Sequence, residues 1–295
     1  MNYNIIEKDN KITIENIKDF EPKHVFECGQ AFRWYMEEDG SYTTIHHGRV
    51  LNVKKEREDL ILSNTNGSEF QNIWYNYFDL DTDYGEIKRE LSKDPILEEA
   101  IKFGEGIRIL NQEPFETIIS FIISANNQIP RIKKSIELIS QNYGKPIDIY
   151  NGKEYFSFPN AEILANIDEK ELEEKNKVGY RAKYIVSTAK MINEKEIDIH
   201  QIPNLSTKEA KEILMKLPGV GPKVSDCVLL FAFNKNDAFP VDVWVKRVME
   251  YFYLKKDTKL KDISTYSYEK FGDLAGFAQQ YLFYYAREKG IGRKK

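Results

Sequence analysis

The chain has 295 residues, of which 41% are hydrophobic and 31% are charged, and it carries a formal net charge of −4. This length supplies ample material for a core, in one large domain or in two to three smaller ones. No apolar run approaches the roughly 20 residues that cross a bilayer, and the first ten residues lack a secretory signal, so we expect a cytoplasmic protein rather than a membrane or secreted one.

Short alternating segments mark the first hundred residues. Apolar and polar residues alternate in segments at 11–14, 42–45 and 50–53, and turn-forming residues stand at 38–40 and 64–67. This pattern predicts an antiparallel sheet. From about residue 83 apolar residues recur at helical spacing. The stretches predicted as helices are 84–100, 115–124, 131–142, 161–167, 182–192, 208–216, a helix beginning at residue 222, 243–251 and 265–289.

The chain is therefore predicted to be α+β, with two regions. We expect an N-terminal antiparallel β domain in residues 1–103 and a mostly α-helical region in residues 104–295. The first region contains 13 Lys and Arg against 21 Asp and Glu, whereas the second contains 30 against 26. A basic surplus is the usual footprint of a protein that binds DNA phosphates. Because this surplus is small, we expect any phosphate contact to be local and to use backbone amides as well.

A glycine hairpin interrupts the helical pattern at residues 217–221, which read Leu-Pro-Gly-Val-Gly. Paired glycines let the main chain approach a ligand closely, and Pro222 suits the first turn of a following helix. The N–H groups at that helix N-terminus can hold an anion such as a DNA phosphate. A tight helix connection with a glycine C-cap explains a bare Gly-x-Gly equally well. The candidate phosphate-binding residues are Gly219, Val220 and Gly221.

Lys223 and Asp242 are the candidate catalytic residues. Lys223 falls in the first turn of the helix after the hairpin, where the helix dipole opposes its charge and favours the nucleophilic amine. Such an amine can form a Schiff base. Cys227 follows four residues later and is expected near the same helix face. Asp242 precedes the apolar run 243–251, where an aspartate is most often an N-cap, and capping would fix its carboxylate near the lysine.

Six short motifs occur in order along nearly the whole chain. They are Gly-Gln-Ala-Phe-Arg-Trp at 29–34, Tyr-Phe-Asp-Leu-Asp at 77–81, Ser-Ala-Asn-Asn-Gln-Ile at 124–129, Val-Gly-Tyr-Arg-Ala at 178–182, the hairpin with its lysine and aspartate, and Gly-Phe-Ala-Gln at 276–279. Together they resemble the helix-hairpin-helix DNA glycosylases and, more narrowly, the 8-oxoguanine DNA glycosylases. The resemblance implies a TBP-like N-terminal sheet and an active-site cleft between two lobes of the helical region.

The resemblance also implies which residues bind the damaged base. Phe283 stacks on the flipped purine, Cys227 lies on its other face, and Gln279 reads its Watson–Crick edge. The carbonyl of Gly29 accepts the N7 proton that 8-oxoguanine has and guanine lacks. Guanine would instead set two acceptors face to face, and an unpaired buried acceptor costs roughly 1–3 kcal/mol. From spacing alone, Gln279 and Phe283 form one helix face with a solvated glutamine beside a core phenylalanine.

Five further residues are implied to contact DNA around the opposite base. Asn126 fills the space that the extruded base leaves, and Arg131 and Arg181 hydrogen-bond the estranged cytosine. Tyr180 wedges into the duplex beside it, and Asn127 adjoins Asn126. From composition alone these asparagines are cap or turn residues and the arginines belong to the surface. Trp244 stands where many relatives have a histidine, so the role of that histidine is not predicted here.

The resulting prediction is a bifunctional DNA N-glycosylase and abasic-site lyase that excises 8-oxoguanine paired with cytosine. We expect a monomer that acts on double-stranded DNA, at the nucleoid if the cell is prokaryotic. We expect neither a cofactor nor a metal, because two cysteines and four scattered histidines form no ligand pattern. Two alternatives remain open, a glycosylase for alkylated bases, which has no use for Lys223, and a non-catalytic DNA-binding module, which explains neither Lys223 nor Asp242.

Overall fold

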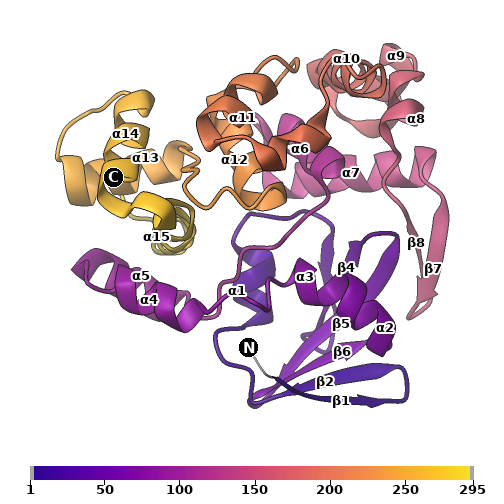
Figure 1. Cartoon of the computed structure of the whole chain (residues 1–295). Helices are drawn as coiled ribbons and strands as arrows, with labels where there is room; N and C mark the ends of the chain where they lie inside the picture. The colour runs from indigo at the N-terminus through magenta and orange to yellow at the C-terminus, as the bar shows by residue number, and fades with distance from the viewer. Residues whose placement is uncertain (1–2, 293–295) are drawn as a thin grey trace.

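A six-stranded antiparallel sheet forms the first part of the chain, as predicted. The computed structural model describes residues 3–292 and orders the strands β1-β2-β6-β5-β4-β3. In Figure 1 this sheet lies below a larger helical part. The strands are β1 (Asn4–Lys8), β2 (Lys11–Glu15), β3 (Trp34–Met36), β4 (Tyr42–His46), β5 (Arg49–Glu56) and β6 (Asp59–Ser63).

Cross-strand pairs of aliphatic residues build the core of the sheet. Ile12 and Ile14 alternate with less buried neighbours along β2, and they pair with Leu62 and Leu60 of β6. All four side chains are fully buried. Such directly opposed side chains are the main source of stability in an antiparallel sheet, so the alternation in the sequence fixes which face of the sheet packs inward.

Helices make up most of the remaining chain, and all but α1 follow the six strands in sequence (Figure 1). The α-helices are α1 (Pro22–Glu27), α2 (Gly67–Glu69), α3 (Tyr75–Tyr77), α4 (Tyr84–Leu91), α5 (Pro95–Phe103), α6 (Pro114–Ser124), α7 (Ile129–Tyr143), α8 (Ala161–Ala165), α9 (Glu169–Asn176), α10 (Ala182–Asn193), α11 (Thr207–Leu214), α12 (Pro222–Ala232), α13 (Val243–Met249), α14 (Leu260–Phe271) and α15 (Ala275–Lys289). Short 3-10 or π segments are η1 (Phe70–Trp74), η2 (Gly179–Arg181), η3 (Ile199–Asn204), η4 (Glu250–Leu254) and η5 (Gly272–Leu274).

Two of the predicted helices are each broken in the structure. The stretch 84–100 forms α4 and α5, because Asp94 accepts hydrogen bonds from the amides of Ile96 (2.9 Å) and Leu97 (3.2 Å) and starts a new helix. The stretch 265–289 is interrupted by Gly272, which takes a φ of +53° between α14 and α15. Apolar residues recur at helical spacing across both breaks, so the sequence pattern did not reveal them.

Besides the short 3-10 helices η2 and η3, two features of the helical region were not predicted. One is a hairpin of β7 (Pro146–Tyr150) and β8 (Lys153–Phe156), whose strands pair antiparallel. The other is α9, which buries Leu172 as its one apolar residue and begins at the cap Asp168. A helix with a single buried apolar side chain gives almost no periodic signal, so the sequence pattern missed it.

Helix α5 packs against the C-terminal helix α15 (Figure 1). The Tyr285 hydroxyl of α15 donates to Glu99 of α5 at 3.2 Å. Asp94, which caps α5, also pairs with Lys270 of α14 at 2.9 Å. Helix α15, which carries Gln279 and Phe283, is therefore held with α14 against the segment that follows the sheet.

Candidate active site

The glycine hairpin joins α11 to α12 and lies against α10. Gly219 takes a φ of +82°, and a Cβ at this position would stand 2.9 Å from the Cβ of Tyr184. The Thr188 hydroxyl donates to the Pro218 carbonyl at 2.9 Å, which fixes the turn. Gly221 is the N-cap of α12 and has open space where its Cβ would be. The first amides of α12 are therefore accessible to an anionic group.

Lys223 lies in the first turn of α12, as predicted, with its Nζ 4.9 Å from the centre of the Phe121 ring. The ammonium also contacts the thiol of Cys227 one turn further on. Burial raises the pKa of Cys227 to about 11, although the charge of Lys223 opposes this rise. The thiol is therefore protonated at neutral pH. In this form it is a weakly polar group that a ligand can pack against, and it is not a nucleophile.

Asp242 caps α13, as its position in the sequence predicts. Its carboxylate accepts hydrogen bonds from the amides of Val245, at 2.8 Å, and Trp244. Burial raises the pKa of Asp242, while these amides and the charges of Lys223 and Arg287 lower it. The structure thus brings Lys223, Cys227 and Asp242 into one site at the N-terminal ends of α12 and α13.

The predicted lesion-binding residues come together from opposite ends of the chain. Gly29 follows α1 and takes a φ of +82°, and a Cβ there would lie 2.9 Å from Cε1 of Phe283 on α15. Only glycine fits against this ring without a shift. Gln279, one turn earlier on α15, is 4% exposed, and its Oε1 has no hydrogen-bond partner within residues 3–292. A buried amide oxygen left unpaired costs roughly 1–3 kcal/mol, so it is suited to accept a bond from a ligand.

The loop between α6 and α7 carries the predicted wedge. Asn126 is exposed and takes a φ of +50°. Arg181 is buried beneath the loop and donates to the carbonyls of Ala125, at 3.0 Å from Nε, and Asn126, at 3.1 Å from Nη2. Asn127 instead caps α6, since its side chain donates to the Ile123 carbonyl at 3.1 Å. The two asparagines therefore differ, with Asn126 presented outward and Asn127 holding the loop.

Two predicted DNA contacts lie exposed near this loop. Tyr180 is 55% exposed, and the guanidinium carbon of Arg181 lies 4.6 Å from its ring centre. Arg131 is exposed on the first turn of α7 and takes no part in the hydrogen bonds that Arg181 makes to the loop. The structure therefore joins Arg181 to Asn126 and Tyr180, and places Arg131 on the exposed first turn of the helix that follows the loop.

Sequence reasoning missed two residues of this site. Phe121, on α6, lies beneath Lys223 and packs edge-on against Phe32 at 5.4 Å between ring centres. Arg287 lies one turn beyond Phe283 on α15, with its guanidinium carbon 5.3 Å from that ring centre. The signal for Arg287 was its spacing of four residues from Phe283. Phe121 had no signal, because aromatic residues in a helical pattern ordinarily belong to the core.

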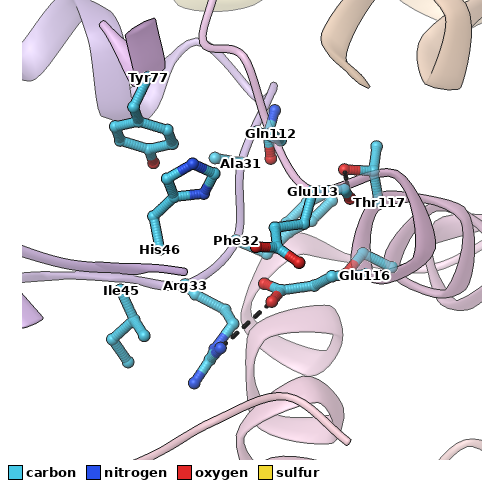
Figure 2. Close-up of a pocket in the computed structure, with 11 residues that line it drawn as sticks. Ala31, Phe32, Arg33, Ile45, His46, Tyr77, Gln112, Glu113, Glu116 and Thr117 are labelled. Atoms are coloured by element: carbon cyan, nitrogen blue, oxygen red, sulfur yellow. Dashed lines mark hydrogen bonds and ion pairs between the residues drawn. The ribbon is translucent and has the colours of Figure 1, made fainter. Parts of the chain in front are cut away.

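A second cluster of charged residues lies between the sheet and α6, apart from this site. Figure 2 shows Arg33 facing Glu116. The Nη1 atom of Arg33 lies 3.2 Å from Oε2 of Glu116. Both residues line a cavity of about 20 Å³, which has room for one water. Burial raises the pKa of Glu116 and lowers that of His46 to about 3. His47 pairs with Glu113, the N-cap residue of α6. The cluster clamps α6 to the sheet.

Two further features are absent from the described residues, a cluster of metal ligands and a helix that could span a membrane. Between residues 3 and 292 no group of three or more His, Cys, Asp or Glu side chains is arranged to hold a metal ion. Over the same residues no helix is both long and apolar enough to cross a membrane. A lysine amine and a carboxylate lie beside a glycine hairpin and an accessible helix N-terminus, an arrangement suited to covalent chemistry next to an anionic group such as a nucleic-acid phosphate.

Comparison with known proteins assigns the chain to a family. Residues 12–118 match the N-terminal domain of 8-oxoguanine DNA glycosylase, and residues 119–273 match the HhH-GPD superfamily base excision DNA repair proteins. The N-glycosylase/DNA lyase of Saccharomyces cerevisiae is 32% identical over 307 residues, covering 88% of this chain and 81% of that protein. A probable N-glycosylase/DNA lyase of Methanothermobacter thermautotrophicus is 34% identical over 218 residues, covering 68% of this chain and 69% of that protein.

A solved structure matches almost throughout. The Clostridium acetobutylicum 8-oxoguanine glycosylase/lyase, in complex with double-stranded DNA containing cytosine opposite 8-oxoguanine, superimposes with a TM-score of 0.96 and 49% identity, covering 99% of this chain and 100% of that one. The chain therefore belongs to the 8-oxoguanine DNA glycosylases of the HhH-GPD superfamily.

Proposed function

We infer that the protein is a bifunctional DNA N-glycosylase and abasic-site lyase of base excision repair, which removes 8-oxoguanine paired with cytosine from double-stranded DNA. The observation that carries this function is the meeting of Lys223 and Asp242 at the start of α12, directly after the hairpin. The names of the two relatives and of the matched solved structure all combine glycosylase and lyase activities.

The proposed reaction assigns roles to Lys223 and Asp242. The amine of Lys223 attacks C1′ of the deoxyribose, and the bond from C1′ to N9 breaks so that the base leaves with the electron pair. The ionised carboxylate of Asp242 stabilises the positive charge that develops on the sugar, and it takes the proton that the amine loses once the bond to C1′ has formed. Ring opening then breaks the C1′–O4′ bond, O4′ takes up that proton, and the lysine Schiff base remains. Loss of a C2′ proton then breaks the C3′–O bond by β-elimination and cleaves the strand.

Lesion recognition is proposed to use both ends of the chain. The base would stack between Phe283 and Cys227, whose protonated thiol is compatible with that contact. The unpaired Oε1 of Gln279 would accept a proton from the Watson–Crick edge. The carbonyl of Gly29, beside Phe283, would accept the N7 proton that marks the oxidised base.

Borohydride trapping on a duplex containing 8-oxoguanine opposite cytosine tests the nucleophile. The wild-type protein is expected to form a covalent adduct with the DNA, and Lys223→Gln to form none. Lys190→Gln, which removes an exposed lysine of α10, is the matched control and should trap normally. An adduct formed by Lys223→Gln would remove this lysine from the mechanism.

The opposite base is tested separately. Asn126, Arg131, Tyr180 and Arg181 are proposed to contact DNA at the vacated position and the estranged cytosine, with Asn127 holding their loop. Single-turnover excision is expected to be faster opposite cytosine than opposite adenine. Equal rates would contradict the roles proposed for the two arginines while leaving the Lys223 chemistry intact.

The division into residues 1–103 and 104–295, and the cleft between helical lobes, are kept as proposals that rest on composition and resemblance. Limited proteolysis tests the division. A first cut near residue 103 supports it, and a first cut between Leu80 and Tyr84, where buried residues change from one core cluster to the other, contradicts it. We place the enzyme where chromosomal DNA lies, in the cytoplasm at the nucleoid if the cell is prokaryotic.

A further inference from the structure

Arg287 is a charged residue that the proposed mechanism leaves unused. It lies one turn beyond Phe283 on α15, and its side chain is only 17% exposed. Its guanidinium carbon is 5.3 Å from the centre of the Phe283 ring, within the range of a cation–π contact. Nη2 pairs with the carboxylate of Glu288 at 2.9 Å. This largely covered arginine is therefore part of the wall behind the stacking ring.

The same guanidinium fastens the segment that carries Gly29. Its Nη2 donates to the carbonyl of Glu27, two residues before Gly29. Its Nη1 lies 3.6 Å from the place where a Cβ of Gly29 would stand. Arg287 thus contacts both the ring that would stack on the base and the segment whose carbonyl would read it. Because a guanidinium is planar and donates in fixed directions, it holds these two parts at a set spacing.

The positive charge of Arg287 also acts on Asp242, one of the two proposed catalytic residues. Asp242 is faced by Lys223 and Cys227 from α12 and by Arg287 from α15. Burial raises the pKa of Asp242, and the positive charges of Lys223 and then Arg287 oppose that rise. Loss of Arg287 should therefore keep Asp242 protonated to a higher pH.

We propose that Arg287 is a positioning residue that sets the spacing between Gly29 and Phe283, and through it the selectivity of the enzyme for 8-oxoguanine. The inference rests on the proposed function, since it assumes that these residues hold the damaged base. A shift of about 1 Å between reacting groups can cost on the order of a hundredfold in rate. At a pH above the acidic limb of the profile, where Asp242 is ionised with or without Arg287, cleavage at an existing abasic site should depend little on Arg287, because it has no base to hold.

Single-turnover rates on two duplexes test this proposal. One duplex contains 8-oxoguanine opposite cytosine, and the other contains an abasic site opposite cytosine. Arg287→Gln is expected to slow base excision at least about tenfold, while abasic-site cleavage stays within about twofold of wild type. Arg287→Lys keeps the charge but not the planar fork, and should recover part of the excision rate. Lys289→Met, which removes an exposed charge from the same turn of α15, should match wild type on both duplexes.

The pH profile of excision is a second readout that a purely structural residue would not move. Its acidic limb is expected to shift to higher pH in Arg287→Gln and to remain in place in Arg287→Lys. Excision by Arg287→Gln at the wild-type rate, or an equal loss of excision and abasic cleavage, would overturn the proposal. A wild-type protein that releases no base would instead contradict the proposed function, so the two failures are distinguishable.

Discussion

Replacing Gly29 with alanine tests the geometry of the lesion pocket directly. The new methyl group would lie 2.9 Å from Cε1 and 3.3 Å from Cζ of Phe283, closer than a carbon contact of about 3.5–4.0 Å allows. Either the ring or the segment after α1 must move. The φ of +82° at Gly29 adds a backbone penalty of roughly 1–2 kcal/mol for any residue with a Cβ.

These two effects can be separated with a matched glycine. Gly40, in the turn before β4, has a φ of +79° but nothing within 4 Å of its Cβ position. Gly40→Ala should therefore carry the same backbone cost, seen as a loss of roughly 1–2 kcal/mol in the free energy of unfolding, with normal excision. Gly29→Ala should show a similar loss of stability and, in addition, at least about tenfold slower excision of 8-oxoguanine, or ~1.4 kcal/mol in the barrier.

The assay is single-turnover release of 8-oxoguanine opposite cytosine, with cleavage of a preformed abasic site as the internal reference. Abasic cleavage should stay near the wild-type rate in both variants, because Lys223 and Asp242 are untouched. If Gly29→Ala excised the base as fast as Gly40→Ala, the contact between Gly29 and Phe283 would not define the pocket. Equal losses on both substrates would also refute the reasoning, since they would indicate global damage.

Three further predictions follow from buried charges. Asp226 is 5% exposed, and its carboxylate pairs with the ammonium of Lys211 at 2.7 Å. Lys211→Met removes this partner. Because burial raises the pKa of Asp226 to about 6, urea unfolding should show a loss of about 3 kcal/mol at pH 8 and a smaller one at pH 5. Burial lowers the pKa of His46 from its usual 6.5 to about 3, so stability should fall by up to about 1.4 kcal/mol per pH unit as pH drops through that window; His46→Phe should flatten this slope. Arg181→Met frees the loop at Asn126 and should slow excision opposite cytosine more than opposite adenine in single-turnover assays.

The sequence was sufficient to predict where Lys223 and Asp242 lie in the fold, because those positions are determined locally. Pro222 and Lys223 follow the hairpin within one helical turn, and the Asp242 cap depends only on the next three residues. The sheet was predictable for the same reason, since alternation along the segment that forms β2 directly encodes the buried face. Each of these features rests on interactions between residues close together in sequence or on a strict two-residue period.

The spacing of the lesion pocket could not be predicted, because it depends on contacts between the two ends of the chain. Resemblance pointed to Gly29 and Phe283 as functional residues, but the closeness of the glycine to the ring follows from packing. Arg287 had no motif, and its bond to the Glu27 carbonyl joins α15 to the end of α1. No periodicity encodes such a contact.

If the carbonyl of Gly29 reads the lesion as proposed, selectivity depends on how firmly the Gly29 segment is attached to the helical part. Gln30 holds one side of it, with Nε2 donating to the Arg108 carbonyl at 2.7 Å and Oε1 accepting from the Leu110 amide at 2.8 Å. Arg287 holds the other side. One hydrogen bond gives a margin of roughly 1–3 kcal/mol between 8-oxoguanine and guanine. This margin is kept only if the Gly29 carbonyl cannot move away from N7 of guanine. Two attachments, one on each side of Gly29, restrict that movement, so selectivity is a property of the packing between sheet and helices as much as of the residues that touch the base.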